Sequence, residues 1–374
     1  AGDGHRQSVA HLERPSLQVG LANLGNTCYQ NAVLQALFHT DSLMEYILVD
    51  DISACFNKTN QDSYRGELVE AFYLLALEVF KRNPREVVTT DQFHKSVGKL
   101  NEVFENNMQH DAGEFPSFLM GGLSEDLNTV LYKPDLLVPE SEPTNTEEKQ
   151  SKVWREYYLR SNYFVIERLF MGQFQSINGC IGCGYSYTKF EKFTTLELRS
   201  PEDGSNTTLY ECLHSYTKRE LMAIVQLKRF SFDNTNTAQG SRTAKKLVNE
   251  VRIPLKNLDL AKYIRGKCDS ALQPTYDLYS VIHHGEGVEE GHYWNTSFSR
   301  EEEEWYFFSD GRVSKVTDDA EICSKTACIL FYMKQDLRGM DGQKIPTTPQ
   351  VAQNLARRGE PMVQESLGQS SAPQ

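Results

Sequence analysis

Residues 20–37, GLANLGNTCYQNAVLQAL, decide the fold, because a turn rich in Gly and Asn delivers one cysteine, Cys28, to the predicted start of a helix. Apolar residues then recur at the spacing of one helical face: Tyr29, Val33, Ala36 and Leu37. Asn26 or Thr27 can cap this helix. The unpaired N–H groups and the positive dipole end at a helix start favour thiolate over thiol, which lowers the pKa of a cysteine there. The stretch therefore predicts a nucleophile at Cys28.

Asn23 lies on the same turn, upstream of Cys28. From there its side-chain amide could donate to the oxyanion that forms when a thiolate attacks a carbonyl carbon. The alternative interpretation makes Cys28 a small buried hydrophobic residue, which is the common state of a free cysteine. Since cysteines at helix starts are not rare, this stretch alone leaves both interpretations open.

The composition excludes several classes of protein. A chain of 374 residues with 39% hydrophobic content can bury a sizeable core, in about two domains or in one elaborated domain. The formal net charge of −12 argues against a nucleic-acid or anionic-membrane partner and fits a basic protein partner better. No apolar run reaches the ~20 residues of a membrane span, and the N-terminal stretch AGDGHRQSVAHLERP lacks the apolar segment of a secretory signal. We therefore expect a soluble intracellular protein, cytoplasmic or nuclear, whose eight dispersed cysteines are reduced.

The first half of the chain has helical periodicity. Helices are expected at residues 66–81, 90–97 and 111–127. Pro116 is tolerated only in a first turn, so the last of these helices should begin near Gly113 or Glu114. Residues 134–152 are polar, acidic and rich in Pro, Ser and Thr, which predicts a solvated insertion inside the domain. Residues 1–17 are expected to be a flexible N-terminal segment.

From Tyr163 onward the pattern changes to strands. Alternating or short β segments, separated by turn residues, occupy residues 164–180, 191–200, 223–232, 248–255, 276–284, 292–299, 304–310 and 327–334. Residues 233–246 are expected to form a loop. Helices first and a long antiparallel β half second predict an α+β fold. The remaining residues, 335–374, are rich in Gly, Pro, Ser and Gln and predict a disordered tail.

A second chemical centre is expected at His292, which begins a predicted strand after a Gly-rich acidic turn. A lone histidine is more often structural than catalytic, but a cysteine and a histidine on a helical half and a β half are arranged as in cysteine proteases. His292 would take the thiol proton and later return it to the leaving amine. A hairpin of residues 292–298 against 304–308 would bring Ser309 and Asp310 near its ring, although Asp310 could also be a turn residue.

Six segments, which follow one another along the chain as ordered motifs, resemble motifs of the ubiquitin-specific proteases, the papain-like deubiquitinating cysteine peptidases. Residues 20–37 are similar to the family's Cys box, and residues 276–293 with 305–313 are similar to its His box. The other similar segments are QHDAGEF (109–115), LFMGQFQSINGCIGC (169–183), VQLKRF (225–230) and ACILFY (327–332). The resemblance covers residues 18–334. It implies one α+β catalytic domain with a helical thumb, an antiparallel β palm and shortened β fingers.

The resemblance also implies an activity, which is thiol-dependent hydrolysis of the peptide or isopeptide bond after the C-terminal Gly of ubiquitin. The partners would be ubiquitin or ubiquitinated proteins, with no nucleic acid and no membrane span. The implied roles are nucleophile for Cys28, oxyanion donor for Asn23, base for His292 and orienting third residue for Ser309, with Asp310 beside it.

The chain departs from the family pattern near both halves of this site. Ser309 stands where the family usually has Asp or Asn, and a hydroxyl carries no charge to stabilise an imidazolium, a role that Asp310 can fill. Trp294 follows His292 and Tyr293 where a small residue is common. The alternative function is therefore a catalytically impaired family member that still binds ubiquitin or acts as a scaffold. A protease for another ubiquitin-like modifier would use the same chemistry.

The expected metal set is incomplete. The family's fingers hold zinc with two CxxC pairs, and here only Cys180 and Cys183 are present. Structural zinc needs four ligands. Cys212 and His214 could complete a Cys₃His set, but Cys212 stands where the family has a packing residue. We therefore expect no cofactor, with shortened fingers and no stable zinc.

Overall fold

The computed structural model describes residues 17–48, 52–105, 108–111, 113–130, 133–139, 146–162, 165–179, 186–201, 203–216, 224–233, 243–263, 274–285 and 291–335. The predicted flexible segment 1–17 and tail 335–374 lie outside these residues, apart from Leu17 and Gln335. In the described ranges, no helix has both the length and the apolar character needed to cross a bilayer.

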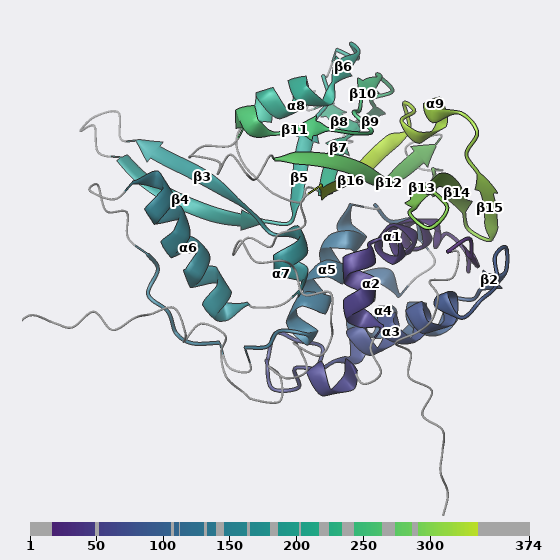
Figure 1. Ribbon diagram of the computed structural model, residues 1–374, viewed down its shortest axis with the longest axis horizontal. Helices are drawn as coiled ribbons and strands as arrows, with labels where there is room; N and C mark the ends of the chain where they lie inside the picture. The colour runs from purple at the N-terminus through teal and green to yellow at the C-terminus, as the bar shows by residue number, and fades with distance from the viewer. Residues whose placement is uncertain are drawn as a thin grey trace, which may run out of the picture.

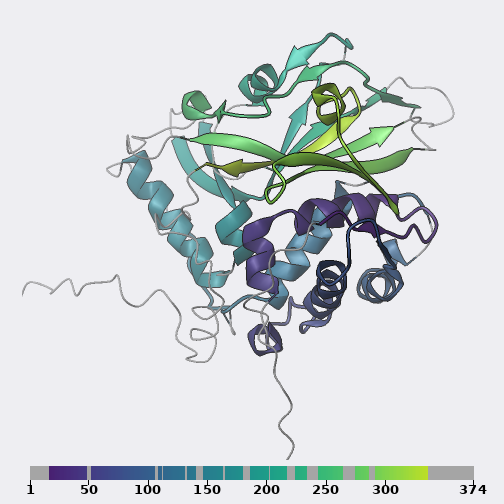
Figure 2. The same cartoon turned by 45° about the vertical axis from the view of Figure 1, so that its right-hand side comes forward.

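The helices of the first half of the chain cover one face of the large sheet, and the helix of residues 209–216 lies on its other face, as Figures 1 and 2 show. The helices of the first half are α1 (Cys28–Phe38), α2 (Asp41–Ile47), α3 (Glu67–Phe80), α4 (Asp91–Leu100), α5 (Glu114–Asp126), α6 (Glu147–Ser161) and α7 (Val165–Phe170), with single turns η2 (Ile52–Cys55) and η3 (Glu102–Phe104). The later helices are α8 (Leu209–Tyr216) and α9 (Asp319–Ile322), with the turn η4 (Ala261–Tyr263). The predicted α+β fold is confirmed, and α5 begins at Glu114 as the position of Pro116 predicts.

The large sheet has the strand order β15-β14-β13-β12-β16-β7-β5 in the described part of the chain, and β11 also pairs with β12. Its strands are β5 (Thr195–Arg199), β7 (Ile224–Lys228), β11 (Leu258–Asp259), β12 (Thr275–Gly285), β13 (His292–Ser299), β14 (Glu304–Ser309), β15 (Arg312–Lys315) and β16 (Ala327–Lys334). All pairs are antiparallel except β5 with β7. The expectation of a purely antiparallel β half is therefore wrong at this edge, because the chain returns to β7 through α8 in the same direction.

Within the residues that the structure describes, four smaller two-stranded pairs accompany the large sheet. They join β1 (Gly20–Leu21) to β2 (Val87–Val88), β3 (Gly172–Gly179) to β4 (Ser186–Phe193), β6 (Thr207–Thr208) to β10 (Val251–Arg252), and β8 (Phe230–Asp233) to β9 (Thr243–Lys246). The ribbon of β3 and β4 lies with α6 at the left of Figure 1, away from the main sheet, where the resemblance placed shortened fingers.

Residues 147–152, predicted to belong to a solvated insertion, begin α6 and are exposed or half-buried, as predicted. Two other local predictions are wrong. Residues 165–170, predicted as part of a strand segment, form α7, whose side chains Val165, Ile166, Leu169 and Phe170 are buried against the other helices. Residues 243–246, predicted as loop, form β9. In each case tertiary packing or pairing supplies the stability that local propensity does not indicate.

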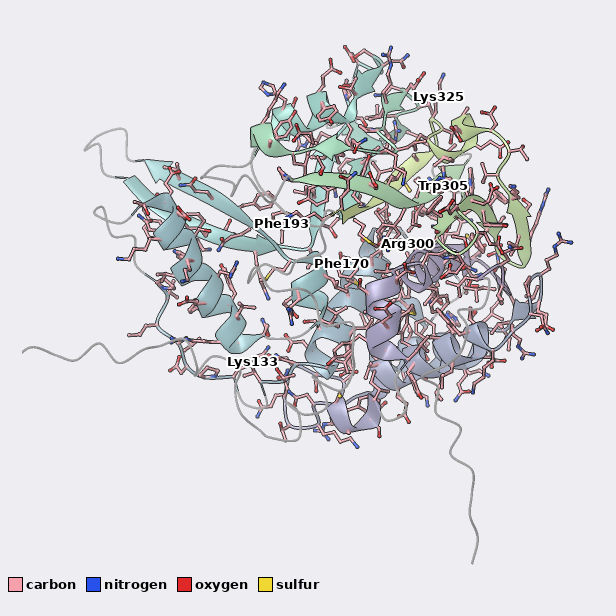
Figure 3. All side chains as sticks on the ribbon, viewed as in Figure 1. Lys133, Phe170, Phe193, Arg300, Trp305 and Lys325 are labelled. Atoms are coloured by element: carbon pink, nitrogen blue, oxygen red, sulfur yellow. The ribbon has the colours of Figure 1, made fainter. Side chains whose placement is uncertain are left out.

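Helix α1 lies at the centre of the molecule. Its predicted apolar face lies in the core, and the polar side chains of Gln30, Asn31 and Gln35 are buried as well, so the helix has no exposed face. On one side it packs against the other helices, and on the other it packs against β12, β13 and β14. The end of β13 is also tied to α2, where Arg300 (labelled in Figure 3) reaches Asp41 at 3.2 Å. This ion pair fixes the chain just after the C-terminal end of α1 against the sheet.

The N-terminus of α3 is capped by a residue from another helix. Gly66 occupies the cap position and has no side chain to accept hydrogen bonds, so Asp126 from α5 accepts from Leu68 N at 3.1 Å and Val69 N at 3.2 Å. Asp126 is fully buried, and burial raises the pKa of its carboxyl group.

We expect Asp126→Ala to lower the free energy of unfolding by about 2–3 kcal/mol, because it leaves these two buried N–H groups without an acceptor. Asp126→Asn keeps an oxygen at the same place and should cost less than half as much. Urea denaturation of the two variants beside the wild type measures this. Equal losses for alanine and asparagine would show that the capping geometry does not carry the stability.

Candidate active site

Cys28 is the first residue of α1, and the turn before it has an unusual backbone. Gly25 and Asn26 have φ values of 102° and 56°, in the left-handed region. Thr27 occupies the predicted cap position, but its hydroxyl makes no capping bond to the helix. It accepts from Leu24 N at 2.9 Å instead and so holds the turn. The predicted cap by Thr27 is therefore wrong, and the backbone N–H groups of Cys28 and Tyr29 face the thiol.

Burial dominates the titration of Cys28, whose exposed fraction is 4%. Burial is the largest effect and raises the pKa of the thiol above its ordinary value, and the negative charge of Asp310 raises it further. Hydrogen bonds from the backbone N–H groups of Tyr293, Tyr29 and Cys28 lower it, but by less. The predicted lowering of this pKa is therefore wrong for the net direction. The thiolate needs a nearby proton acceptor.

The raised pKa of Cys28 leads to a prediction for a variant that lacks the proton acceptor His292. In His292→Ala, alkylation of Cys28 by iodoacetamide should rise with pH and reach half its maximum at a higher pH than for a free cysteine peptide, because the thiol pKa is raised by burial. Mass spectrometry of the Cys28 peptide gives the rate. A midpoint below that of the free peptide would show that the helix N-terminus outweighs burial.

His292 begins β13, opposite Gly285 of β12. The residue before it, Gly291, lies against His284, and a Cβ there would come 1.8 Å from the Nε2 atom of His284. Only glycine fits this approach. The hairpin of β13 with β14 pairs Asn295 with Phe308, and it brings Ser309 and Asp310 to the His292 ring as the sequence predicts.

The His292 ring turns one nitrogen toward this pair of residues. Its Nε2 atom is 2.8 Å from the Ser309 hydroxyl and 3.9 Å from Asp310 Oδ2. The nearby carboxylate favours a proton on Nε2, which then donates to the Ser309 oxygen. This tautomer leaves Nδ1 able to accept a proton.

Two asparagine amides hold the Asp310 carboxylate. Asn23 Nδ2 donates to Oδ2 at 3.0 Å, and Asn31 Nδ2 donates to Oδ1 at 2.8 Å. The backbone is fixed as well, because Leu21 N donates to Asp310 O at 3.0 Å and Asp310 has a left-handed φ of 51°. Sequence reasoning missed Asn31. The available signal was a polar residue three positions after Cys28 on a helix expected to pack in the core.

Asn23 has a second role in the turn. Its Oδ1 atom accepts from Gly25 N at 2.9 Å and Thr27 N at 3.2 Å. One N–H of its amide is bound to Asp310, and the other is the group that would reach an oxyanion, so this role stays a prediction. The backbone N–H of Cys28, at the start of α1, is a second group that we expect to reach this oxygen.

Two other histidines in the sheet do not fit the role of base. Burial lowers the pKa of His283 to about 3. Burial, together with the charges of Lys246 and His292, lowers the pKa of His284 to about 4. His283 is completely buried and His284 is stacked on Tyr293 at 4.3 Å between ring centroids. Both rings are neutral at physiological pH, and His292 is the one that faces Ser309 and Asp310.

Of the residues considered as zinc ligands, the two that the structure describes do not point toward a common site. Cys180 and Cys183 lie outside the described residues. Cys212 is 3% exposed within the core beneath α8, where burial raises the pKa of its thiol, and His214 is exposed. Residues two apart on a helix point about 200° apart. Within the described ranges, no group of three His, Cys, Asp or Glu residues could hold a metal ion.

We therefore expect purified protein to carry well under one zinc per chain, because two thiolates leave most zinc positions open. Cys180→Ser should change the melting temperature little, and a chelator should hardly shift it. Elemental analysis and thermal denaturation check this. Stoichiometric zinc that is lost with stability in His214→Ala would contradict it, because His214 is exposed and contributes nothing to the core.

The family model described as ubiquitin carboxyl-terminal hydrolase matches residues 19–332. Ubiquitin carboxyl-terminal hydrolase 2 of Bos taurus is 29% identical over 345 residues, covering 84% of this chain and 54% of that protein. The protein of the same name from Gallus gallus is 31% identical over 343 residues, covering 84% of this chain and 92% of that protein. The chain thus spans about half the length of the bovine relative.

A solved structure shares the fold. The SAGA DUB module Ubp8/Sgf11/Sus1/Sgf73 bound to ubiquitin aldehyde contains a chain that matches with a TM-score of 0.64 and 21% identity. The match covers 88% of this chain and 72% of that one. At this identity the likeness shows the architecture, which agrees with the helical layer and sheet described above.

Proposed function

This chain belongs to the ubiquitin carboxyl-terminal hydrolase family, and from that premise we propose that it is a cysteine-type ubiquitin hydrolase. It would cleave the peptide or isopeptide bond after the C-terminal glycine of ubiquitin. The observation that carries the proposal is the position of the His292 ring, 2.8 Å from Ser309 and 3.9 Å from Asp310. The next residue on the strand, Tyr293, donates its backbone N–H to the sulfur of Cys28 at the start of α1.

The first step is transfer of the Cys28 proton. Nδ1 of His292 accepts the proton while Nε2 keeps its own and donates to Ser309. The charge of Asp310 opposes thiolate formation, since it raises the pKa of Cys28, but it stabilises the imidazolium that forms. The neutral hydroxyl of Ser309 carries no charge to stabilise the imidazolium, so this stabilisation comes from Asp310.

The next steps follow from the same atoms. The thiolate attacks the carbonyl carbon of the terminal glycine, and the oxygen becomes an oxyanion facing the start of α1 and Asn23. The imidazolium returns the proton to the leaving amine, the C–N bond breaks and a thioester remains on Cys28. A water, deprotonated by His292, then attacks the thioester and releases the carboxylate and the thiol.

Ubiquitin is the proposed partner. The formal net charge of −12 favours partners with basic groups near their binding surface. A ubiquitin with a fluorophore on its C-terminus tests the proposal directly, because the fluorophore is released only when the bond after the terminal glycine breaks. We expect release by the wild type. Absence of release would overturn the proposed hydrolase activity.

One observation favours a second function. The Cys28 thiol has a raised pKa, and the side chain nearest to the ring nitrogen of the proposed base His292 is the neutral hydroxyl of Ser309. A chain with this weaker activation that binds ubiquitin without releasing the fluorophore would be a ubiquitin-binding or scaffold protein. Isothermal titration with ubiquitin beside the release assay separates the two functions.

A further inference from the structure

Trp294 lies next to the proposed base on the same strand face. It is two residues after His292 on β13, and successive residues on one face of a strand are close neighbours. The rings of Trp294 and His292 are stacked, with centroids 6.3 Å apart and planes at 23°. The register of β13 with β14, continued by one residue beyond Asn295 and Phe308, places Trp294 opposite Ser309.

The indole ring is itself held in place. Trp294 stacks on His283 of β12, with centroids 5.4 Å apart and planes at 4°, and it also contacts Phe307 at 6.5 Å. Gly285 makes room for the indole, because a Cβ there would come 2.6 Å from its Cζ3 atom. A side chain with contacts on several sides has one preferred orientation.

The ring beneath Trp294 is rigid as well. His283 is completely buried, and its nitrogens are 3.0 Å from the Thr296 hydroxyl and 3.2 Å from the Thr326 hydroxyl. Burial lowers the pKa of His283 to about 3, so it presents a neutral ring at physiological pH. The stack therefore runs from a fixed, uncharged histidine in the core to a tryptophan and then to His292.

His292 needs such a support. Its side chain is 42% exposed, and Nε2 makes a hydrogen bond to a hydroxyl that can itself rotate. A single bond of this kind fixes one ring atom but leaves the tilt of the ring open. The face of Trp294 limits that tilt, and an indole face also attracts an imidazolium more than a neutral ring.

We propose that Trp294 is a positioning residue for His292: its indole ring sets the plane of the imidazole so that Nδ1 faces the Cys28 thiol while Nε2 stays on Ser309. This inference rests on the proposed role of His292 as base. It concerns ring orientation alone and needs no contact between Trp294 and ubiquitin.

The test compares Trp294→Leu, which keeps apolar bulk without a ring, with Trp294→Phe, which keeps a flat ring. With the ubiquitin–fluorophore substrate we expect kcat to fall roughly 10- to 100-fold in the leucine variant, since a misplaced catalytic group costs about that much. KM should stay within about twofold, and phenylalanine should restore most of kcat. Trp305→Phe is the matched control, because Trp305 (labelled in Figure 3) contacts Phe298 with ring centroids 5.6 Å apart, toward the other end of the same hairpin.

A second readout does not involve ubiquitin. The rate of Cys28 alkylation by iodoacetamide at neutral pH reports how well His292 takes the thiol proton. We expect the rate in Trp294→Leu to fall toward that of His292→Ala, and the rates in Trp294→Phe and Trp305→Phe to stay near the wild type. Urea denaturation confirms that each variant is folded.

The two proposals fail in different ways. A wild type that does not release the fluorophore overturns the proposed function, while the alkylation rates still test Trp294. Wild-type kcat and a wild-type alkylation rate in Trp294→Leu would overturn the inference. Equal losses in the leucine and phenylalanine variants would also overturn it, because they would show that a flat ring at this position does not matter.

Discussion

Cys28→Ala should lower kcat for release of a fluorophore from the C-terminus of ubiquitin by roughly 10⁴-fold or more. The physical reason is that the thiolate forms the covalent intermediate, so the remaining groups have no nucleophile to activate. The change removes one sulfur atom at a helix start that Thr27 and Asn23 hold together through the turn, so the fold should survive.

The matched control is Cys55→Ala, which removes a cysteine outside the site and should leave kcat unchanged. Fluorophore release and ubiquitin binding are measured on the same preparations. Cys28→Ala should bind ubiquitin about as tightly as the wild type. Substantial release by Cys28→Ala would show that another group attacks the carbonyl carbon.

Asp310→Ala should cost more than Ser309→Ala, although Ser309 lies closer to the ring. We expect a loss in kcat of roughly 10³-fold for Asp310→Ala and about tenfold for Ser309→Ala, because a charge is needed to select the tautomer of the neutral imidazole and to stabilise the imidazolium. Asp310 lies 3.9 Å from Nε2 and is held rigidly by two amides, so its field acts from a fixed position.

Two further variants make this comparison sharper. Asn31→Ala removes one of the amides from Asp310 and should give an intermediate loss, because the carboxylate remains but is less well oriented. Asp319→Ala removes an exposed carboxylate from α9 and should leave kcat unchanged. Equal and small effects of Asp310→Ala and Ser309→Ala would mean that His292 is oriented by other groups.

The sequence predicts the parts of the site that local pattern encodes. A cysteine after a turn rich in Gly and Asn indicates the start of α1, and a short turn between two aromatic-rich strands indicates the hairpin that brings Ser309 to His292. Pro116 fixes the start of α5, because its missing N–H is tolerated only in a first turn.

The missed features depend on residues far apart in the chain. Asn31 is a polar residue in a helix, and its partner Asp310 is 279 positions away. The raised pKa of Cys28 arises from burial by β13 and the helices, which the helix start alone does not indicate. The sequence shows Trp294 at a position where a small residue is common. Its contact with His292, however, depends on the pairing of β12 with β13 and on the space left by Gly285.

The central claim is that Cys28 is the nucleophile of a ubiquitin hydrolase, and a ubiquitin carrying an electrophile at its C-terminus tests it most directly. Intact-mass analysis followed by peptide mapping should show one adduct per chain, on Cys28. His292→Ala should react much more slowly, because the buried thiol has no proton acceptor. An adduct on another cysteine, or full labelling of Cys28→Ala, would contradict the account.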